Sequence, residues 1–174
     1  MKETEVKILE IDRKTIERKL RSLGARKMSD KKMYFLCFDF NDGSLKKANN
    51  LLRLRKEGDK TILTFKGFVS DKNVRVREEI EVEVSDFKTA RTILEMLGLS
   101  VWLEMRKRRI AYHLDGTHFE FDKYLGKHSY IPEFLEIEGK DAKTIRRYVK
   151  LLGFSSKDCK LWTAVKLIRH YSKR

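Results

Sequence analysis

The chain has 174 residues, of which 41% are hydrophobic and 38% charged, which suits one folded domain spanning residues 1–174 and argues against disorder. No segment approaches the roughly 20 apolar residues of a membrane span, and the N-terminus lacks the apolar stretch of a secretory signal, so a cytoplasmic protein without membrane attachment is predicted. The net charge of +14 makes nucleic-acid binding the first hypothesis, which the placement of the basic residues must decide.

The first half of the chain is predicted to be mostly strands. A strand over 3–7 precedes a helix over 16–25, and a strand over 32–40 ends at the turn 41–44. Strands over 51–57 and 61–67 form a hairpin around Gly58-Asp59, and a long alternating strand follows over 73–84.

The second half alternates helices with strands. A helix over 90–99 leads to paired strands over 105–114 and 118–125, which turn at Asp115-Gly116. A strand over 136–138 and a helix over 143–154 follow, and the capping pair Ser155 and Asp158 predicts a last helix from 155 to 171. The predicted fold class is therefore α+β, dominated by antiparallel strands, with about eight strands and four helices.

A strand with alternating glutamates, an acidic cap, an amphipathic helix and a Leu-Gly pair occur in this order three times, which indicates a weak internal repeat. The predicted caps are Asp12, Ser85 with Asp86, and Asp141, and the predicted helix stops are Gly24, Gly98 and Gly153. Phe87, Ile93, Leu94 and Leu97 lie at helical spacing and are predicted to be core residues.

Most of the strands have one face made of charged side chains. A period of two places these residues on one side of each strand, and same-sign neighbours there repel unless counterions bind between them. One interpretation is a sheet face exposed to water. The other is a curved or closed sheet whose charged face turns inward to hold a polyphosphate and divalent metals. The inward residues would be Lys7, Arg53, Arg55, Lys66, Arg75, Arg77, Lys107 and Arg109, with Glu3, Glu5, Glu79, Glu81, Glu120, Asp122, Glu136 and Glu138.

Seven short motifs contain these charged residues and follow one another along the chain. They are Glu3-x-Glu5-x-Lys7, LRLR with Arg53 and Arg55, LTFKG with Lys66, RxExE from Arg77 to Glu81, KxR with Lys107 and Arg109, FEFD ending at Asp122, and LEIE with Glu136 and Glu138. Taken in order, they resemble the motifs of the CYTH superfamily, the triphosphate tunnel metalloenzymes. The resemblance implies an eight-stranded antiparallel closed β-barrel, a tunnel lined by charges, with helices packed outside.

The resemblance also implies roles for individual residues. Arg53, Arg55, Lys66, Arg77, Lys107, Arg109 and Lys160 would bind the triphosphate. Glu3, Glu5, Glu79, Glu81, Asp122, Glu136 and Glu138 would hold Mg or Mn, with Glu79, Glu81 and Asp122 alternatively orienting water and the basic side chains. Catalytic roles are implied for Lys7, Arg109 and Glu81.

Within this superfamily, the amino-acid sequence is most similar to the class IV adenylyl cyclase-like branch, which converts ATP to cyclic AMP and pyrophosphate. The alternatives are an inorganic or thiamine triphosphatase, and a non-enzymatic module that binds polyphosphate or RNA ends. The expected partner is a small triphosphate, with no membrane and with nucleic acid disfavoured, in a monomer or homodimer. His113 and His118 share the parity of the charged face, but a strand histidine more often only donates a hydrogen bond. Trp162 is predicted to serve in packing, and Cys37 and Cys159 to be reduced thiols.

Overall fold

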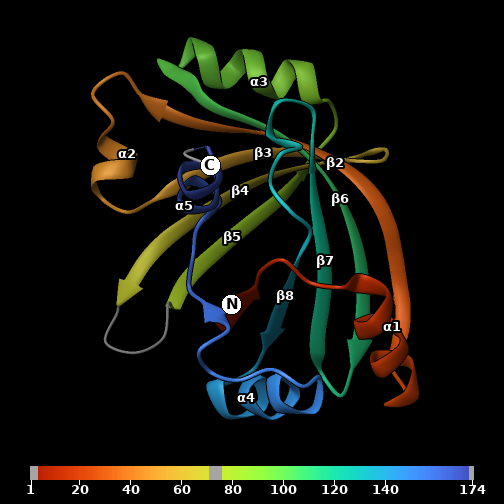
Figure 1. Ribbon diagram of the computed structural model, residues 1–174. Coiled ribbons are helices and arrows are strands. Elements are labelled where there is room, and N and C mark those ends of the chain that lie inside the picture. The colour runs from red at the N-terminus through yellow and green to blue at the C-terminus, as the bar shows by residue number, and fades with distance from the viewer. Residues whose placement is uncertain (1–3, 71–75, 173–174) are drawn as a thin grey trace.

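The computed structural model describes residues 4–70 and 76–172, and Figure 1 shows the arrangement of its helices and strands. The strands are β1 (Thr4–Ile8), β2 (Arg26–Phe40), β3 (Leu51–Glu57), β4 (Lys60–Ser70), β5 (Val76–Val84), β6 (Leu99–Leu114), β7 (Thr117–Leu125), β8 (Phe134–Gly139) and β9 (Cys159–Lys160). The helices are α1 (Arg13–Ser22), α2 (Ser44–Lys47), α3 (Phe87–Met96), α4 (Ala142–Leu151) and α5 (Ala164–Tyr171), with a short 3-10 turn at Gly126–His128. In the described part of the chain, no helix is long and apolar enough to cross a membrane.

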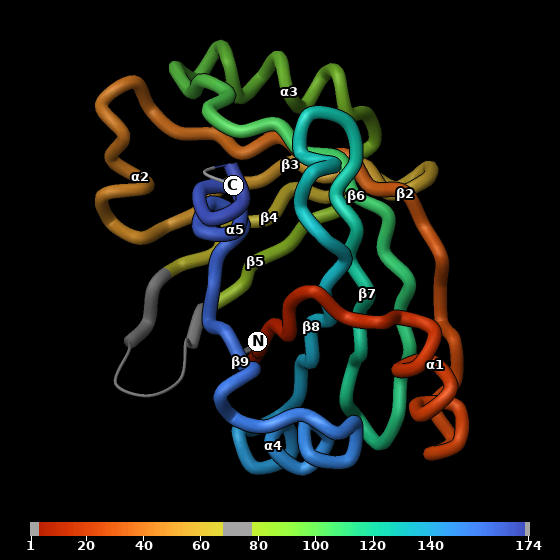
Figure 2. The backbone as a smooth tube through the Cα atoms, viewed as in Figure 1, coloured from red at the N-terminus to blue at the C-terminus, as the bar shows by residue number. Residues whose placement is uncertain are grey.

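The strands form one nine-stranded sheet in the order β5-β4-β3-β2-β6-β7-β8-β1-β9, and every pairing in it is antiparallel. The backbone trace shows how strongly this sheet bends, with β4 and β5 on the opposite side from β7 and β8 (Figure 2). The α+β class is confirmed, and all eight predicted strands are present. The two-residue β9 was not predicted, and closure of the sheet into a barrel stays a prediction.

Three helices have the predicted cap and stop residues, although each begins one to three residues earlier than predicted and ends three residues earlier. The aspartate carboxylate at each predicted cap accepts the backbone N–H three residues ahead, at 3.4 Å for Asp12, 2.7 Å for Asp86 and 2.7 Å for Asp141. The glycine after each of these helices has φ near +90°, where a side chain would be strained, and the three are Gly24, Gly98 and Gly153.

The last helix was predicted wrongly. Ser155 does bond the carboxylate of Asp158, from both its N–H and its hydroxyl at 2.8 Å, but this pair closes an isolated turn. Such side-chain bonds stabilise turns as readily as helix starts. Residues 159–160 then pair with β1 instead of continuing a helix, and α5 begins after Thr163, whose hydroxyl accepts the N–H of Lys166 at 3.2 Å. The turn predicted at 41–44 also leads into an extra one-turn helix, α2.

The helices cover the sheet on both faces. Helices α1 and α4 pack on the outward side of β6, β7 and β8, through Ile16, Leu20, Ile145, Tyr148, Phe119 and Phe121 among others. Helix α3 packs on the outward side of β2 and β3 through Leu94, Leu36 and Leu54. The core assignment in α3 was only partly right, because Ile93 and Leu97 are 53% and 66% exposed. Helix α5 packs instead against inward residues, which include Met33, Phe35, Met105 and Tyr124.

Candidate active site

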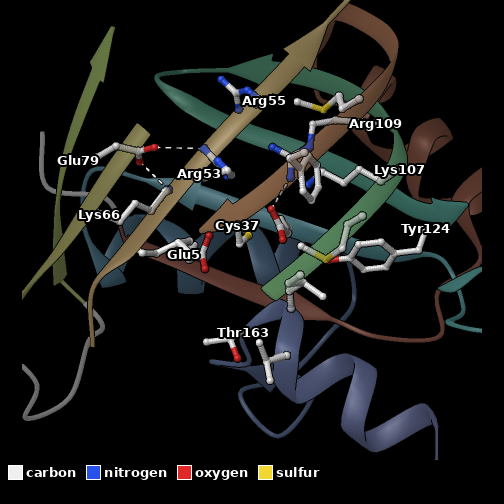
Figure 3. A pocket seen from close by; sticks show the side chains of 18 of the residues that line it. Glu5, Cys37, Arg53, Arg55, Lys66, Glu79, Lys107, Arg109, Tyr124 and Thr163 are labelled. Atoms are coloured by element: carbon white, nitrogen blue, oxygen red, sulfur yellow. Dashed lines mark hydrogen bonds and ion pairs between the residues drawn. The ribbon is translucent and has the colours of Figure 1, made fainter. Parts of the chain in front are cut away.

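A cavity of about 590 Å³ lies between the inward face of the sheet and the first residues of α5 (Figure 3). Most of the residues predicted to face inward line it: Glu5, Lys7, Arg53, Arg55, Lys66, Glu79, Glu81, Lys107, Arg109, Glu120, Glu136 and Glu138. The charged faces of the strands therefore turn toward one cavity, which favours the interior interpretation over a face exposed to water. Glu3 and Arg75 lie outside the described residues, as does the side chain of Arg77.

The wall formed by β3, β4 and β5 carries an excess of cationic donors. Lys66 Nζ lies 2.6 Å from Glu79, and Arg53 Nη2 lies 3.4 Å from the same carboxylate. The carboxylates nearest to Arg55, on Glu57 and Glu81, are 3.7 Å away, which is beyond hydrogen-bond distance. The Nε atoms of both arginines are buried without a hydrogen-bond partner in the described structure. Burial, and then the neighbouring Arg55, lower the pKa of Arg53, so this wall would gain from an anion that supplies acceptors.

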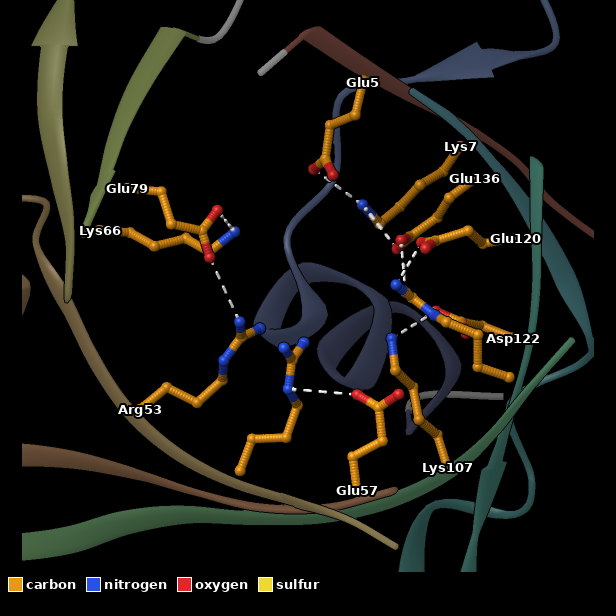
Figure 4. A network of polar contacts seen from close by, with 12 residues as sticks. Glu5, Lys7, Arg53, Glu57, Lys66, Glu79, Lys107, Glu120, Asp122 and Glu136 are labelled. Atoms are coloured by element: carbon orange, nitrogen blue, oxygen red, sulfur yellow. Dashed lines mark hydrogen bonds and ion pairs between the residues drawn. The ribbon is translucent and has the colours of Figure 1, made fainter. Parts of the chain in front are cut away.

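Lys7 extends from β1 into the opposite wall, which Figure 4 shows across the interior from Lys66 and Glu79. Its Nζ lies 3.0 Å from Glu5 and 3.0 Å from Glu136. Burial alone would lower the pKa of Lys7, but Glu136 and Glu5 raise it above its ordinary value. Burial would raise the pKa of Glu136, but its ion pairs with Lys7 and Arg109 hold that pKa well below its usual range. Lys7 is therefore a fixed ammonium group, which favours phosphate binding over service as a base.

Asp122 anchors the basic residues of β6 from beneath the cavity lining. Its side chain is fully buried and accepts hydrogen bonds from Lys107 Nζ at 2.5 Å and from Arg109 Nε and Nη2 at 2.7 and 2.6 Å. Arg109 also donates to Glu136 at 2.7 Å and contacts Glu120. Because its oxygens are occupied by these donors, Asp122 fits the predicted orienting role better than that of a metal ligand.

Glu5 and Glu138 face each other across β1 and β8, and Lys7 faces Glu136 in the same ladder. Directly opposed carboxylates repel unless a cation lies between them. No group of three or more acidic, histidine or cysteine residues close enough to hold a metal is found among the described residues. One or two carboxylates still suit Mg or Mn, which in nucleotide sites take their remaining ligands from water and substrate phosphates. The residues present therefore fit a hard divalent ion bound together with a triphosphate.

Some predicted contacts are not brought into the cavity. Lys160 lies on β9 and its Nζ donates to the carbonyl of Lys157 at 2.9 Å, so it is not part of the lining. His113 and His118 lie beside each other with their rings tilted by 54° and 5.0 Å between ring centroids, and they are absent from the lining as well. Trp162 packs beside His170, 4.8 Å away, as predicted for a packing residue.

Sequence reasoning missed the uncharged side chains of the same lining. They are Met33, Phe35, Cys37, Leu51, Trp102, Leu103, Met105 and Tyr124, with Thr163, Ala164 and Val165 at the start of α5. Phe35 and Cys37 lie opposite Arg55 and Arg53 in the ladder of β2 and β3. Trp102 reaches the interior because of a bulge: Cys37 pairs with Leu103 and Phe38 with Val101, which leaves Trp102 without a partner on β2. Lys46 Nζ lies 4.3 Å from the centre of the Trp102 ring. Regular alternation along β6 would have placed Trp102 on the outward face.

Comparison with known proteins agrees with this geometry. The model of the CYTH domain matches residues 1–157. The Methanocaldococcus jannaschii protein named "Putative adenylate cyclase MJ0240" is 30% identical over 138 residues, which cover 79% of this chain and 77% of that protein. The solved structure of the Pyrococcus horikoshii PH1012 protein has a TM-score of 0.80 at 26% identity, covering 95% of this chain and 98% of that one.

A more distant solved structure shares the fold. It is the Hippeastrum protein HpAC1, described as a "putative adenylyl cyclase" with a dominant triphosphatase activity, and it has a TM-score of 0.69 at 16% identity over 98% of this chain and 96% of its own. The family match extends over nearly the whole chain and includes the strands that line the cavity. This chain belongs to the CYTH domain family.

Proposed function

We propose that this protein is a divalent-metal-dependent enzyme that binds a nucleoside triphosphate in the cavity and converts ATP to cyclic AMP and pyrophosphate. The observation that carries the proposal is the mixed lining of the cavity. Beside the cations that suit a phosphate chain it includes apolar and aromatic side chains, which inorganic triphosphate would not need. About 590 Å³ is within the range of sites that enclose small organic ligands.

The phosphate chain is assigned to the space between the two charged walls. Arg53, Arg55 and Lys66 would bind it from one side and Lys7 and Arg109 from the other, since guanidinium and ammonium donors both suit phosphate oxygens. Asp122 keeps Arg109 and Lys107 in place before the substrate arrives, so little reorganisation would be needed. A bound Mg or Mn, held by the facing pair Glu5 and Glu138, would neutralise phosphate charge and polarise the P–O bonds.

In cyclisation the ribose 3′-oxygen bonds to the α-phosphorus, and the bond from that phosphorus to the β-phosphate oxygen breaks to release pyrophosphate. We assign the hydroxyl proton to Glu81, a carboxylate of the lining that accepts a hydrogen bond from Thr64 at 2.7 Å. The cationic walls would hold the pyrophosphate as it leaves. The base and ribose would contact apolar side chains of the lining, near Trp102 and Met105.

Hydrolysis is the second candidate, because a fold relative is described as having a dominant triphosphatase activity. The same walls would then stabilise the terminal phosphoryl group while water attacks it. Inorganic triphosphate and thiamine triphosphate are the substrates to compare with ATP.

The test is to assay ATP, inorganic triphosphate and thiamine triphosphate with Mg and with Mn. Cyclic AMP with pyrophosphate selects the cyclase, and free phosphate selects the hydrolase. The double variant Glu3→Gln with Glu5→Gln should lose metal-dependent turnover, whereas Glu95→Gln on the exposed face of α3 should not. Binding of triphosphate without any turnover would instead favour the non-enzymatic module, and unchanged turnover in the double variant would refute the metal site.

A further inference from the structure

The outward face of α4 carries only positive charge. Its inward face is apolar and buried in the core through Ile145, Tyr148 and Val149. The opposite face presents four exposed cations at the spacing i, i+3, i+4 and i+7, which places them in one stripe along the helix. We call them the α4 stripe: Lys143, Arg146, Arg147 and Lys150.

This stripe works against the stability of its own helix. Like charges three or four residues apart each cost about 0.2–0.5 kcal/mol, and the stripe contains four such pairs, so the total is about 1–2 kcal/mol. In α3 and α1 at least one basic residue has an acid at that spacing: Arg91 bonds Glu95 at 2.8 Å, and Arg13 bonds Glu17 at 3.2 Å. Within the described residues, no member of the stripe forms a salt bridge. A surface shaped only for stability would not have this arrangement.

Helix α1 extends the positive surface. Lys19 of α1 donates to the carbonyl of Leu152 at the end of α4, at 2.6 Å, so the C-terminal ends of the two helices meet. Lys14, Arg18 and Arg21 of α1 are also exposed. The cavity does not account for the net charge of +14, since its walls hold cations and acids in similar numbers. Among the described residues, most of the excess positive charge therefore lies outside the cavity.

We propose that the α4 stripe, flanked by α1, binds the phosphodiester backbone of a nucleic-acid duplex. Four cations along about 10 Å of helix meet a polyanion that carries one charge per about 1.7 Å of its axis. An anionic membrane fits less well, because interfacial helices insert an apolar face and that of α4 is buried in the core. This binding surface is separate from the cavity and would act independently of turnover.

The salt dependence gives the proposal a magnitude. Four phosphate contacts imply a slope of about −3.6 for the logarithm of the affinity against the logarithm of the salt concentration. Between about 50 and 200 mM salt, the affinity should therefore fall about 150-fold. Each stripe cation that is neutralised should reduce the slope by about one, whatever the base sequence.

The experiment measures binding of duplex DNA and duplex RNA of about 20 base pairs with 5′-hydroxyl ends, so that no terminal triphosphate can enter the cavity. The stripe variant carries Lys143→Gln, Arg146→Gln, Arg147→Gln and Lys150→Gln. The control removes the same charge from exposed lysines elsewhere, through Lys32→Gln, Lys56→Gln, Lys88→Gln and Lys127→Gln. Both should keep wild-type turnover of ATP, and the stripe variant should melt at the same or a higher temperature.

The proposal stands if the stripe variant loses the salt-dependent binding and the control retains it. Equal losses in the two variants would mean that overall charge alone is responsible, and would overturn it. Absence of duplex binding by the wild type at low salt, or binding of anionic phospholipid vesicles without binding of either duplex, would also overturn it. If the stripe variant proves less stable, the single changes Arg146→Gln and Arg147→Gln should still each lower the slope by about one.

Discussion

Replacing Asp122 with asparagine should be one of the most damaging single-atom changes in this protein. The aspartate is fully buried and accepts three charged hydrogen bonds, from Lys107 Nζ at 2.5 Å and from Arg109 at 2.7 and 2.6 Å. Asparagine keeps the shape but removes the negative charge, and it turns one acceptor into a donor that faces two cations. Two buried positive charges then lose their main counter-charge.

The magnitude follows from burial more than from geometry. Breaking a buried ion pair on one side costs about 3–5 kcal/mol, which in a chain of this size lowers the melting temperature by about 6–20 °C. The matched control is Asp30→Asn. Asp30 accepts the same fork from an arginine, with Arg108 Nε and Nη2 at 2.7 and 2.8 Å, but the Arg108 side chain is 49% exposed. An exposed pair contributes at most about 1 kcal/mol.

The assay is thermal and denaturant unfolding of the metal-free protein near pH 8, followed by turnover of ATP at a temperature where both variants are folded. Asp122→Asn should lose both stability and turnover, since Arg109 loses the group that orients it. Asp30→Asn should keep both. Equal destabilisation by the two changes, or none by Asp122→Asn, would refute the view that this carboxylate anchors the charged wall.

Three further outcomes are expected. Burial raises the pKa of Glu120 from 4.5 to about 7, with Arg109 opposing this shift and Glu136 adding to it. Because the folded state holds the Glu120 proton more tightly than the unfolded state, this group stabilises the fold fully below about pH 4.5. That stabilisation, up to about 3 kcal/mol, is lost as the pH rises to about 7. Unfolding in EDTA from pH 5 to 8 should show this slope, Glu120→Gln should flatten it, and an equal slope in both proteins would exclude Glu120 as its source. Trp102→Ala should raise KM for ATP about tenfold, the equivalent of about 1.4 kcal/mol of lost ring contact, and leave KM for inorganic triphosphate unchanged. Equal rises in KM for both substrates would mean that the adenine base binds elsewhere. Thr163→Ala should cost about 1 kcal/mol by removing the cap of α5, which denaturant unfolding against Thr163→Ser would measure, and no loss would mean that the hydroxyl does not cap the helix.

The charged interior could be predicted because strand alternation is rigid. Once Arg53 and Arg55 are assigned to one face of a strand, the residues between them must lie on the other, and Leu54 is indeed fully buried outside the charged wall. The cap and stop residues of the helices could also be predicted, because an aspartate cap and a glycine stop act within one turn of the chain. Neither feature depends on knowing which strands are neighbours.

The features that sequence reasoning missed depend on tertiary pairing. The bulge that turns Trp102 inward exists only as a register shift between β2 and β6, and nothing in the local sequence requires it. The false helix at 155 arose because the bonds between Ser155 and Asp158 are the same in an isolated turn. Residues 159–160 leave the helical path because β1 offers an edge to pair with.

The two walls of the cavity differ in how far their charges are satisfied, and this difference suggests how a substrate would be received. Arg109 is held by three carboxylates, which raise its pKa well above the ordinary value although burial opposes them. Arg53 and Arg55 instead keep buried Nε donors without partners, and burial lowers the pKa of Arg53. If the cavity binds a triphosphate with a divalent ion, as proposed, the phosphate chain would gain most at the wall of β3 and β4, where it would supply the missing acceptors. The opposite wall is already balanced by its acids, so it would take a divalent ion only by exchanging those acids from ammonium and guanidinium to metal. The two walls would therefore serve different parts of one substrate, with the phosphate oxygens at the first and the ion at the second.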